Sequence, residues 1–273
     1  VSAPAAEIRA HPPEAISCLQ CGHDILSAKR ERYHRACREK ANTGKAGMGM
    51  SERIVVVTDI HGCYTKLMEL LKKLEFSEKE DRMICLGDMM DRGSQCYEVF
   101  QYFYHIKERM QDRCVLIRGN HEQMLLDARK DPILWRLNGG GQTVRSFKEH
   151  RDSVRNYLDW FDALPLYYEH ERFICVHAGL RYERLEDNPG DILLWDRHAI
   201  ENGSYRGKLV LAGHTPLREP IYLDGREGAA ILEEDERVPL MDTGMIGLDT
   251  GCVFGGKLTG MVIDGEEFYV KSV

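Results

Sequence analysis

The sequence Gly87-Asp88-Met89-Met90-Asp91-Arg92-Gly93 decides the fold that we predict for this chain. It follows an apolar run, residues 83–86, that is typical of a buried strand. A carboxylate therefore lies just beyond the carboxyl end of a strand, where open α/β sheets place their functional sites. A second carboxylate, an arginine and a turn-forming glycine follow directly. Alone, so short a motif is more often a solvated loop.

Four further polar motifs occupy the same position after an apolar run. They are Asp59-Ile60-His61-Gly62, Gly119-Asn120-His121-Glu122, His177-Ala178-Gly179 and Gly213-His214-Thr215. Any one of these histidines would more often be an ordinary buried or surface side chain. Together, motifs of one kind at the ends of successive strands predict a single composite site.

The 273-residue chain is 43% hydrophobic and 30% charged, enough for one large domain with a substantial core. Its net charge of −7 argues against general binding to nucleic acid or to an anionic membrane. We find no apolar stretch long enough to span a bilayer and no secretory signal. Several of the nine cysteines lie in apolar runs, as buried thiols do in a reducing compartment. We therefore expect a cytoplasmic monomer without nucleic-acid or membrane partners.

Residues 1–50 differ in composition from the rest of the chain and end in a glycine-rich linker at residues 43–50. They contain Cys18, Cys21, His34 and Cys37, whose spacing suits a structural zinc ion. Two alternatives stay open: a disordered tail whose cysteines fall together by chance, and a native chain that begins at Met50. We predict an N-terminal extension over residues 1–50 and a catalytic domain over residues 51–273.

From residue 54 the sequence alternates between strand and helix patterns, which indicates an α/β (α+β) fold. Strands are predicted at residues 54–57, 83–86 and 114–117, and amphipathic helices around residues 67–74 and 96–103. Residues 121–163 are predicted to be helical, with a break at residues 138–141 that either rims the site or merely links helices. Short strands are then predicted at residues 172–176, 192–195, 209–212, 221–223, 246–248, 257–263 and 267–270, with hairpin turns at residues 224–225 and 264–265.

The residues after these strands offer oxygen and nitrogen ligands without cysteine: Asp59, His61, Asp88, Asn120, His177 and His214. Such a set suits two divalent ions, with Mn²⁺ our first choice and Fe²⁺ or Zn²⁺ as alternatives. Ions ~3.5–4 Å apart need a shared ligand, and Asp88 in the central motif is our candidate. We assign Asp59 and His61 to the first ion, and Asn120, His177 and His214 to the second. Two dications and two carboxylates leave a positive site that favours phosphate.

Three further residues complete the predicted site. His121 is predicted to be the general acid that protonates the leaving oxygen, with Asp91 orienting it, although a purely supporting hydrogen bond is the alternative. Arg92 and Arg197 are candidates to bind phosphate oxygens by bidentate donation, although Arg197 by itself resembles a surface cation. Glu122 is expected to be structural support.

These motifs resemble those of the phosphoprotein phosphatase family of calcineurin-like metallophosphoesterases, above all its bacterial and phage branch. The resemblance keeps the family's order from about residue 54 to residue 264 and leaves residues 1–50 uncovered. It also includes Leu137-Asn138-Gly139-Gly140-Gly141, Trp195-Asp196-Arg197, Gly213-His214-Thr215-Pro216 and Asp249-Thr250-Gly251. It implies a sandwich of two mixed β-sheets flanked by helices. It also implies the same metal ligands, phosphate binding by Arg92 and Arg197, the acid pair of His121 and Asp91, and a supporting role for Asp249-Thr250-Gly251.

The resemblance implies a serine/threonine protein phosphatase, with phosphotyrosine as a further substrate, in which a hydroxide held by two metal ions attacks the phosphate. The expected partner is thus a phosphoprotein or phosphopeptide. One alternative is a symmetrical dinucleoside tetraphosphate hydrolase, whose group shares the metal motifs. That group tends to have Asp where this chain has Glu122 and lacks the Trp195-Asp196-Arg197 form. A second alternative is a partner-binding module with a vestigial site, and the complete ligand set argues against it.

Overall fold

The computed structural model describes residues 16–17, 24–26, 52–226 and 228–273. Strands β1 (Ile16–Ser17) and β2 (Asp24–Leu26) pair in a two-stranded antiparallel sheet. The predicted zinc ligands Cys18, Cys21, His34 and Cys37 lie outside the described residues. Within the described part of the chain, no helix is both long and apolar enough to cross a membrane.

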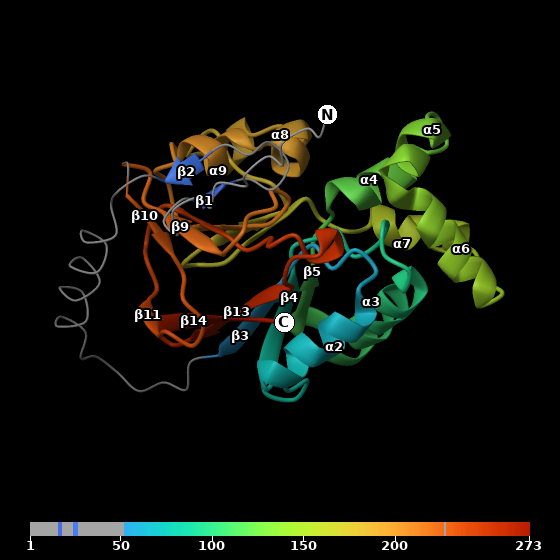
Figure 1. The fold of residues 1–273 in the computed structure, drawn as a ribbon, viewed down its shortest axis with the longest axis horizontal. Coiled ribbons are helices and arrows are strands. Elements are labelled where there is room, and N and C mark those ends of the chain that lie inside the picture. Colours follow the sequence, from blue (N-terminus) through green and yellow to red (C-terminus); the bar gives the residue numbers. More distant parts are fainter. Residues whose placement is uncertain (1–15, 18–23, 27–51, 227) are drawn as a thin grey trace, which may run out of the picture.

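Two six-stranded mixed sheets stack on each other and form the centre of the molecule (Figure 1). The first has the order β11 (Val238–Pro239), β14 (Glu267–Ser272), β13 (Thr259–Asp264), β3 (Arg53–Val57), β4 (Asp81–Cys85) and β5 (Cys114–Leu116). The second has the order β10 (Ala229–Ile231), β9 (Ile221–Leu223), β12 (Met245–Gly247), β8 (Val210–Ala212), β7 (Ile174–Val176) and β6 (Tyr167–Glu169). The predicted sandwich of two mixed sheets is confirmed.

Each sheet contains three neighbouring parallel strands, and these carry the predicted motifs. Strands β3, β4 and β5 are parallel in the first sheet, and β7, β8 and β12 are parallel in the second. Because parallel strands end at the same edge of a sheet, the segments that follow them emerge side by side. The remaining strands pair antiparallel at the flanks, among them the β9–β10 and β13–β14 hairpins that the turn signals predicted.

The hydrophobic core forms three layers, because the parallel strands are buried on both faces. Val55 and Val57 of β3 pack against α2 (Tyr64–Lys73) and α3 (Cys96–Met110). Ile54 and Val56 point the other way, into the layer between the sheets. The outer face of the second sheet packs against α8 (Gly190–Trp195) and α9 (His198–Asn202). Helices thus flank both sheets, as Figure 1 shows.

A helical lobe, residues 120–162, is inserted between β5 and β6. It contains α4 (Asn120–Asp127), α5 (Pro132–Trp135), a π-helical turn (Arg136–Gly140), α6 (Gly141–Glu149), a 3-10 helix (Val154–Tyr157) and α7 (Leu158–Asp162). The predicted break is present: Gly139 has φ of 101°, which favours glycine. Phe100 of α3 holds the lobe, since its ring lies 5.4 Å from Phe147 and 5.4 Å from Phe161.

One predicted strand is wrong. Residues 192–195 belong to helix α8, which begins after Pro189. A short apolar run cannot be assigned to strand or helix from its periodicity, and proline is favoured at a helix start because its φ is already helical. Leu193 and Leu194 are buried whereas Trp195 is 42% exposed, so the run covers one side of a helix. Strands β6, β10 and β11, of two or three residues each, were not predicted.

Candidate active site

The candidate site lies where the carboxyl ends of both parallel strand groups meet. Asp59 and His61 follow β3, Asp88 follows β4, and Asn120 begins α4 after β5. From the second sheet, His177 follows β7 and His214 follows β8. All six are buried, with between 0% and 8% of their surface exposed. The structure therefore brings together all six residues that the sequence predicted as ligands of the two-metal site.

The loops that carry these residues adopt an uncommon backbone conformation. Non-glycine residues with positive φ include Asp59, His61, Asp88, Asp91, Arg92 and His214. Such residues are rare and concentrate at functional sites. Hydrogen bonds between the loops hold the conformation: the amide of His61 donates to the carbonyl of Asp88 at 2.9 Å, and that of Gly93 to the carbonyl of His61 at 3.0 Å. The backbone thus fixes where the polar side chains point.

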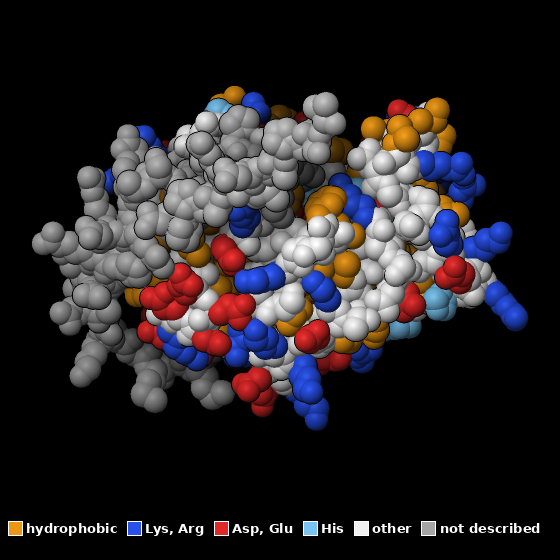
Figure 2. Space-filling model, in the orientation of Figure 1, with side chains coloured by type: hydrophobic (Ala, Val, Ile, Leu, Met, Phe, Trp, Pro, Cys, Tyr) orange, Lys and Arg blue, Asp and Glu red, His pale blue; other side chains and the backbone are white. Residues whose placement is uncertain are grey.

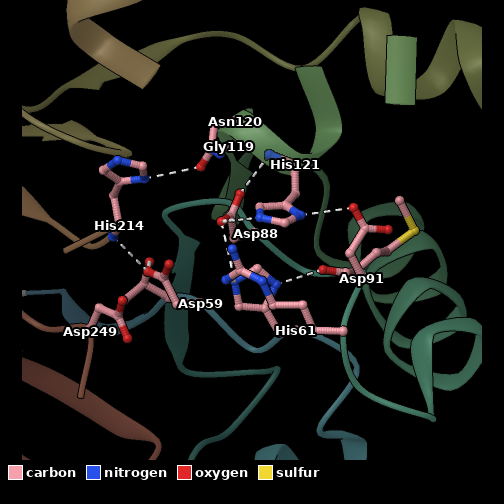
Figure 3. Close-up of polar contacts among 12 residues, drawn as sticks. Asp59, His61, Asp88, Asp91, Gly119, Asn120, His121, His214 and Asp249 are labelled. Atoms are coloured by element: carbon pink, nitrogen blue, oxygen red, sulfur yellow. Dashed lines mark hydrogen bonds and ion pairs between the residues drawn. The ribbon is translucent and has the colours of Figure 1, made fainter. Parts of the chain in front are cut away.

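Asp88 lies at the centre of the cluster, where Figure 3 shows it in contact with His61 and His121. Its Oδ2 is 3.3 Å from His61 Nε2, and its Oδ1 is 3.4 Å from His177 Nε2. Two groups of side chains that are able to hold a metal ion share this carboxylate: His61, Asp88 and His121, and Asp59, Asp88 and His177. Asp88 therefore has the position that the sequence analysis predicted for a bridging ligand.

A second set of ligand atoms converges on the opposite side of Asp88. The Nδ1 atom of His177 lies 2.9 Å from the carbonyl of Leu86, to which it donates. In a neutral ring this leaves the Nε2 lone pair facing Asn120 Oδ1 at 2.9 Å and Asp88 Oδ1 at 3.4 Å. His214 Nδ1 lies 3.0 Å from the same Asn120 oxygen. Lone pairs that point at one another in this way fit a cation, so the donor set suits a metal ion.

The charges in the site also favour a bound cation. Burial alone would lower the pKa of His177, but Asp88 outweighs it and raises the pKa to about 10. Burial, with repulsion from Asp59, raises the pKa of Asp249 to about 8. Both shifts reflect carboxylates that are crowded together out of water. A metal ion would replace the protons that this arrangement otherwise attracts.

The predicted acid pair is present behind Asp88. His121 Nδ1 lies 2.8 Å from Asp91 Oδ2, which fixes the ring so that Nε2 faces Asp88 Oδ2 at 3.9 Å. Two lobe residues hold Asp91 in turn: Trp135 donates its Nε1–H to Oδ2 at 2.9 Å, and the Thr143 hydroxyl donates to Oδ1. Burial lowers the pKa of His121, although both carboxylates oppose it. This geometry allows His121 to act as an acid or as a ligand.

The ligand cluster opens into a cavity of about 200 Å³. Arg92 and Arg197 both line it, beside Asp88, Asn120 and His214. Arg92 Nη1 donates to His61 Nε2 at 2.8 Å, and its guanidinium lies 5.0 Å above the ring of Phe254. Both predicted phosphate-binding arginines thus face the same space as the ligand cluster.

Glu122 has the supporting position that the sequence analysis expected. Its side chain is fully buried and accepts hydrogen bonds from the backbone amides of Asp88, Met89 and Gly119, each at 2.9 Å. One carboxylate therefore ties the loop after β4 to the start of α4.

Gly213 offers a direct test of how tightly the site is packed. A Cβ at this position would lie 2.0 Å from Asp59 Oδ2 and 2.3 Å from Thr58 Oγ1. We predict that Gly213→Ala destabilises the protein by about 1–3 kcal/mol, the usual cost of overpacking, and displaces Asp59. Gly141→Ala is the matched control, because nothing lies within 4 Å of its added methyl group. Thermal unfolding of both variants measures the difference, and equal melting temperatures would show that the contact is not tight.

Comparison with known proteins agrees with this geometry. Residues 52–244 match the family model for calcineurin-like phosphoesterases, which covers more than half of the chain. The chain belongs to the calcineurin-like phosphoesterase family. It is therefore a metallophosphoesterase, a hydrolase of phosphoric esters, and the candidate site is that of a family that works with a two-metal centre.

Two curated relatives of this metallophosphoesterase point to different substrates. The serine/threonine-protein phosphatase 1 of Salmonella typhimurium is 31% identical over 221 residues, which cover 75% of this chain and 88% of the relative. A symmetrical bis(5'-nucleosyl)-tetraphosphatase of Vibrio parahaemolyticus is 26% identical over 270 residues, covering 79% and 97%. The two relatives thus belong to the same family and differ in the substrate that their names give.

A solved structure shows the same fold. A serine/threonine phosphatase from Saccharomyces cerevisiae, similar to human phosphatase PP5, superposes with a TM-score of 0.60 over 82% of this metallophosphoesterase and 80% of that chain. At 14% sequence identity, this likeness concerns the fold alone.

The structure adds site residues that the sequence did not identify. Trp135 and Thr143 hold Asp91, and Phe254 lines the cavity. Neither Trp135 nor Thr143 directly follows a strand, since both lie in the helical lobe, so the pattern of a polar motif after an apolar run could not identify them. Asn138, whose place was left open, does line the cavity, so the break in the lobe rims the site.

Proposed function

We propose that this metallophosphoesterase is a phosphomonoesterase that acts on phosphoserine and phosphothreonine, and also on phosphotyrosine, in proteins. The observation that carries the proposal is the catalytic cavity. Its volume of about 200 Å³ suits one phosphoryl group with the first atoms of its ester, and Arg92 and Arg197 line it. Arginines hold phosphate oxygens well because their donors match the geometry of the anion. The similarity to the Salmonella protein phosphatase gives independent support.

We assign the two metal ions to the ligand cluster, with Mn²⁺ as our first choice. Asp59, His61 and Asp88 would hold one ion, and Asp88, Asn120, His177 and His214 the other. When bound, two such ions supply an activated nucleophile at neutral pH and Lewis-acid stabilisation of the phosphoryl group. The protein orients its ligands: Met90 and Leu86 accept from the Nδ1 atoms of His61 and His177, which directs each Nε2 into the site.

The remaining side chains have distinct proposed tasks. Arg92 and Arg197 bind and orient the phosphoryl oxygens. His121 gives its proton to the leaving oxygen, and Asp91 holds the ring in the tautomer that the step requires. Such an arrangement is too complete for a vestigial site, so we favour an enzyme over a pure binding module.

One observation favours the alternative substrate. Trp195 and Phe254 line the cavity and are 42% and 52% exposed. Exposed aromatic rings at a cavity rim can stack on a nucleobase. A dinucleoside tetraphosphatase, as the Vibrio relative is described, therefore remains the second candidate.

A paired assay separates the two substrates. Manganese-dependent turnover of a phosphoserine peptide and of diadenosine tetraphosphate would be measured with the same enzyme preparation. We expect kcat/KM for the peptide to be higher by at least an order of magnitude, since the cavity fits one phosphoryl group. A higher kcat/KM for diadenosine tetraphosphate than for the peptide would favour the tetraphosphatase. No turnover of either substrate, with or without manganese, would favour a binding module.

We also propose that the boundary near residue 50 separates an accessory extension from the catalytic domain. Every contact of the described site lies within residues 58–254. A chain that begins at Met50 is therefore expected to retain its kcat on p-nitrophenyl phosphate within about twofold. Loss of most activity would place the boundary elsewhere. Zinc analysis of the full chain and the truncated chain tests the proposed zinc ligands. If they bind zinc, the full chain contains one more zinc ion than the truncated chain.

The cysteines support the proposed cytoplasmic location. All six in the described part of the chain are free thiols: Cys63, Cys85, Cys96, Cys114, Cys175 and Cys252. Unpaired thiols are typical of a reducing compartment.

A further inference from the structure

The helical lobe contains a groove that the proposed chemistry does not use. The groove has a volume of about 810 Å³ and lies between α4, α5, α6 and the 3-10 helix at Val154–Tyr157. Leu125, Pro132, Val144 and Leu158 give it an aliphatic lining. Arg129, Arg136, Lys148 and Arg155 add four positive charges to the same lining. We call this feature the lobe groove.

The charge of the lobe groove contrasts with that of the whole protein. Residues 129–155 contain seven arginines and lysines against three acidic residues, in a chain of net charge −7. The four basic side chains of the groove are exposed, and no carboxylate of the described residues pairs with them. The acidic residue in the lining, Asp152, is already engaged by the amide of Ser153 at 2.7 Å and the hydroxyl of Tyr157 at 2.6 Å. Figure 2 shows basic side chains on the lobe beside the apolar surface over α5.

One short segment of the lobe contributes to the lining of both the lobe groove and the catalytic cavity. Pro132, Trp135 and Arg136 line the groove, and Asn138, two residues further on, lines the cavity. Leu137, which lies between Arg136 and Asn138 in the sequence, is 81% exposed, so this segment presents an apolar side chain to solvent. Trp135 also connects the groove with the chemistry, because its indole donates to Asp91, the partner of His121. A polypeptide with one residue in the cavity can therefore extend past this segment toward the groove.

We propose that the lobe groove binds an acidic segment of a polypeptide substrate that flanks the phosphorylated residue. The proposal rests on the proposed protein phosphatase function and adds a substrate preference to it. Four unpaired cations match a run of Asp or Glu, and the aliphatic lining matches the side chains between them. Nucleic acid fits less well, because single strands bind through exposed aromatic platforms, whereas Trp135 and Phe147 of the lining are 6% and 0% exposed.

Matched peptides and variants test the lobe groove. One phosphoserine peptide carries a run of four glutamates beside the phosphoserine, on the N-terminal side in one version and on the C-terminal side in another. The matched peptides carry glutamine in place of glutamate. We expect kcat/KM to be about tenfold higher for at least one acidic peptide than for its glutamine-containing match. Each exposed pair of opposite charges strengthens binding by a factor of up to about five, so two or more such pairs are enough. Arg129→Gln with Arg155→Gln should remove most of this preference.

A second pair of substitutions controls for the loss of charge alone. Lys72→Gln with Lys79→Gln removes two exposed cations that line neither the groove nor the cavity, and it should leave the preference intact. Equal kcat/KM for acidic and neutral peptides in the unmodified protein would overturn the proposal. The proposal would also be overturned if the lysine double variant lost the preference for acidic peptides to the same extent as the arginine double variant.

A binding measurement separates failure of the groove from failure of the proposed function. Fluorescence anisotropy of a labelled, unphosphorylated glutamate-rich peptide should show salt-dependent binding that the Arg129→Gln/Arg155→Gln variant loses. If no phosphopeptide is turned over but this binding persists, the phosphatase proposal fails and the groove stands. If phosphopeptides are turned over and the acidic peptide does not bind, only the groove proposal fails. If an oligouridylate binds as strongly as the acidic peptide, and the Arg129→Gln/Arg155→Gln variant loses this binding too, the groove is a nucleic-acid site and the groove proposal is overturned.

Discussion

Replacing Asp88 with asparagine is expected to reduce the occupancy of both metal ions and to lower turnover by more than ~10²-fold, the loss typical of removing one electrostatic stabiliser. The reason is the position of this carboxylate, whose two oxygens lie 3.3 Å from His61 Nε2 and 3.4 Å from His177 Nε2. An amide offers one oxygen and no charge, so it cannot neutralise two adjacent cations. Metal analysis of the purified variant measures the occupancy.

His214→Ala is the matched comparison for Asp88→Asn. The His214 side chain lies on the Asn120 side of the cluster, with its Nδ1 atom 3.0 Å from Asn120 Oδ1, whereas its contact with Asp59 is made by the backbone amide, which alanine retains. Its loss should therefore weaken the binding of one ion and leave the other in place. Two tightly held ions in Asp88→Asn would disprove the bridging role, and loss of both ions in His214→Ala would show that the sites cannot be separated.

The second large effect is expected for His121→Asn, and it depends on the substrate. General acid catalysis is typically worth ~10²–10⁴-fold, and the alkoxide that leaves phosphoserine needs the proton. Nitrophenolate is a far better leaving group and needs less help. We therefore expect a loss in that range on a phosphoserine peptide and a clearly smaller loss on p-nitrophenyl phosphate, with both metal ions retained. Steady-state kinetics on both substrates, with metal analysis, provide the measurement.

Other outcomes for His121→Asn would assign the residue a different role. Equal losses on the two substrates, with both ions in place, would indicate phosphate positioning. Loss of one ion would make His121 a ligand, which its position beside His61 and Asp88 allows. Asp91→Asn is the companion variant, because Asp91 contacts His121 at 2.8 Å. It should retain both ions and show the same dependence on the leaving group, more weakly.

The sequence predicted the ligand cluster because its signal is local. A polar motif directly after a β-branched or apolar run identifies the end of a strand, and neighbouring parallel strands end together. Asp59, Asp88 and His177 could be placed by this rule without knowledge of the strand order. The positive φ values of Asp59 and Asp88 and the hydrogen bonds between the loops could not be predicted, because they depend on which loops become neighbours.

The parts that the sequence did not predict depend on tertiary contacts. Trp135 reaches Asp91 only because the lobe folds back over the β4 loop, and nothing in its local sequence indicates that contact. The error at residues 192–195 has the opposite cause, since a short buried helix and a buried strand have the same local pattern. The lobe groove could not be predicted for a third reason: its basic residues lie in the turn after α4, the π-helical turn, α6 and a 3-10 helix, and they converge only in the folded chain.

The central claim is that one composite site holds two metal ions that act together, and a metal titration tests it most directly. The protein would be freed of metal by a chelator and then titrated with Mn²⁺ while bound manganese and turnover of a phosphoserine peptide are followed together. We predict that two ions bind per chain and that turnover reaches its plateau only when both are bound. Full turnover with one bound ion, or with none after chelation, would contradict the account.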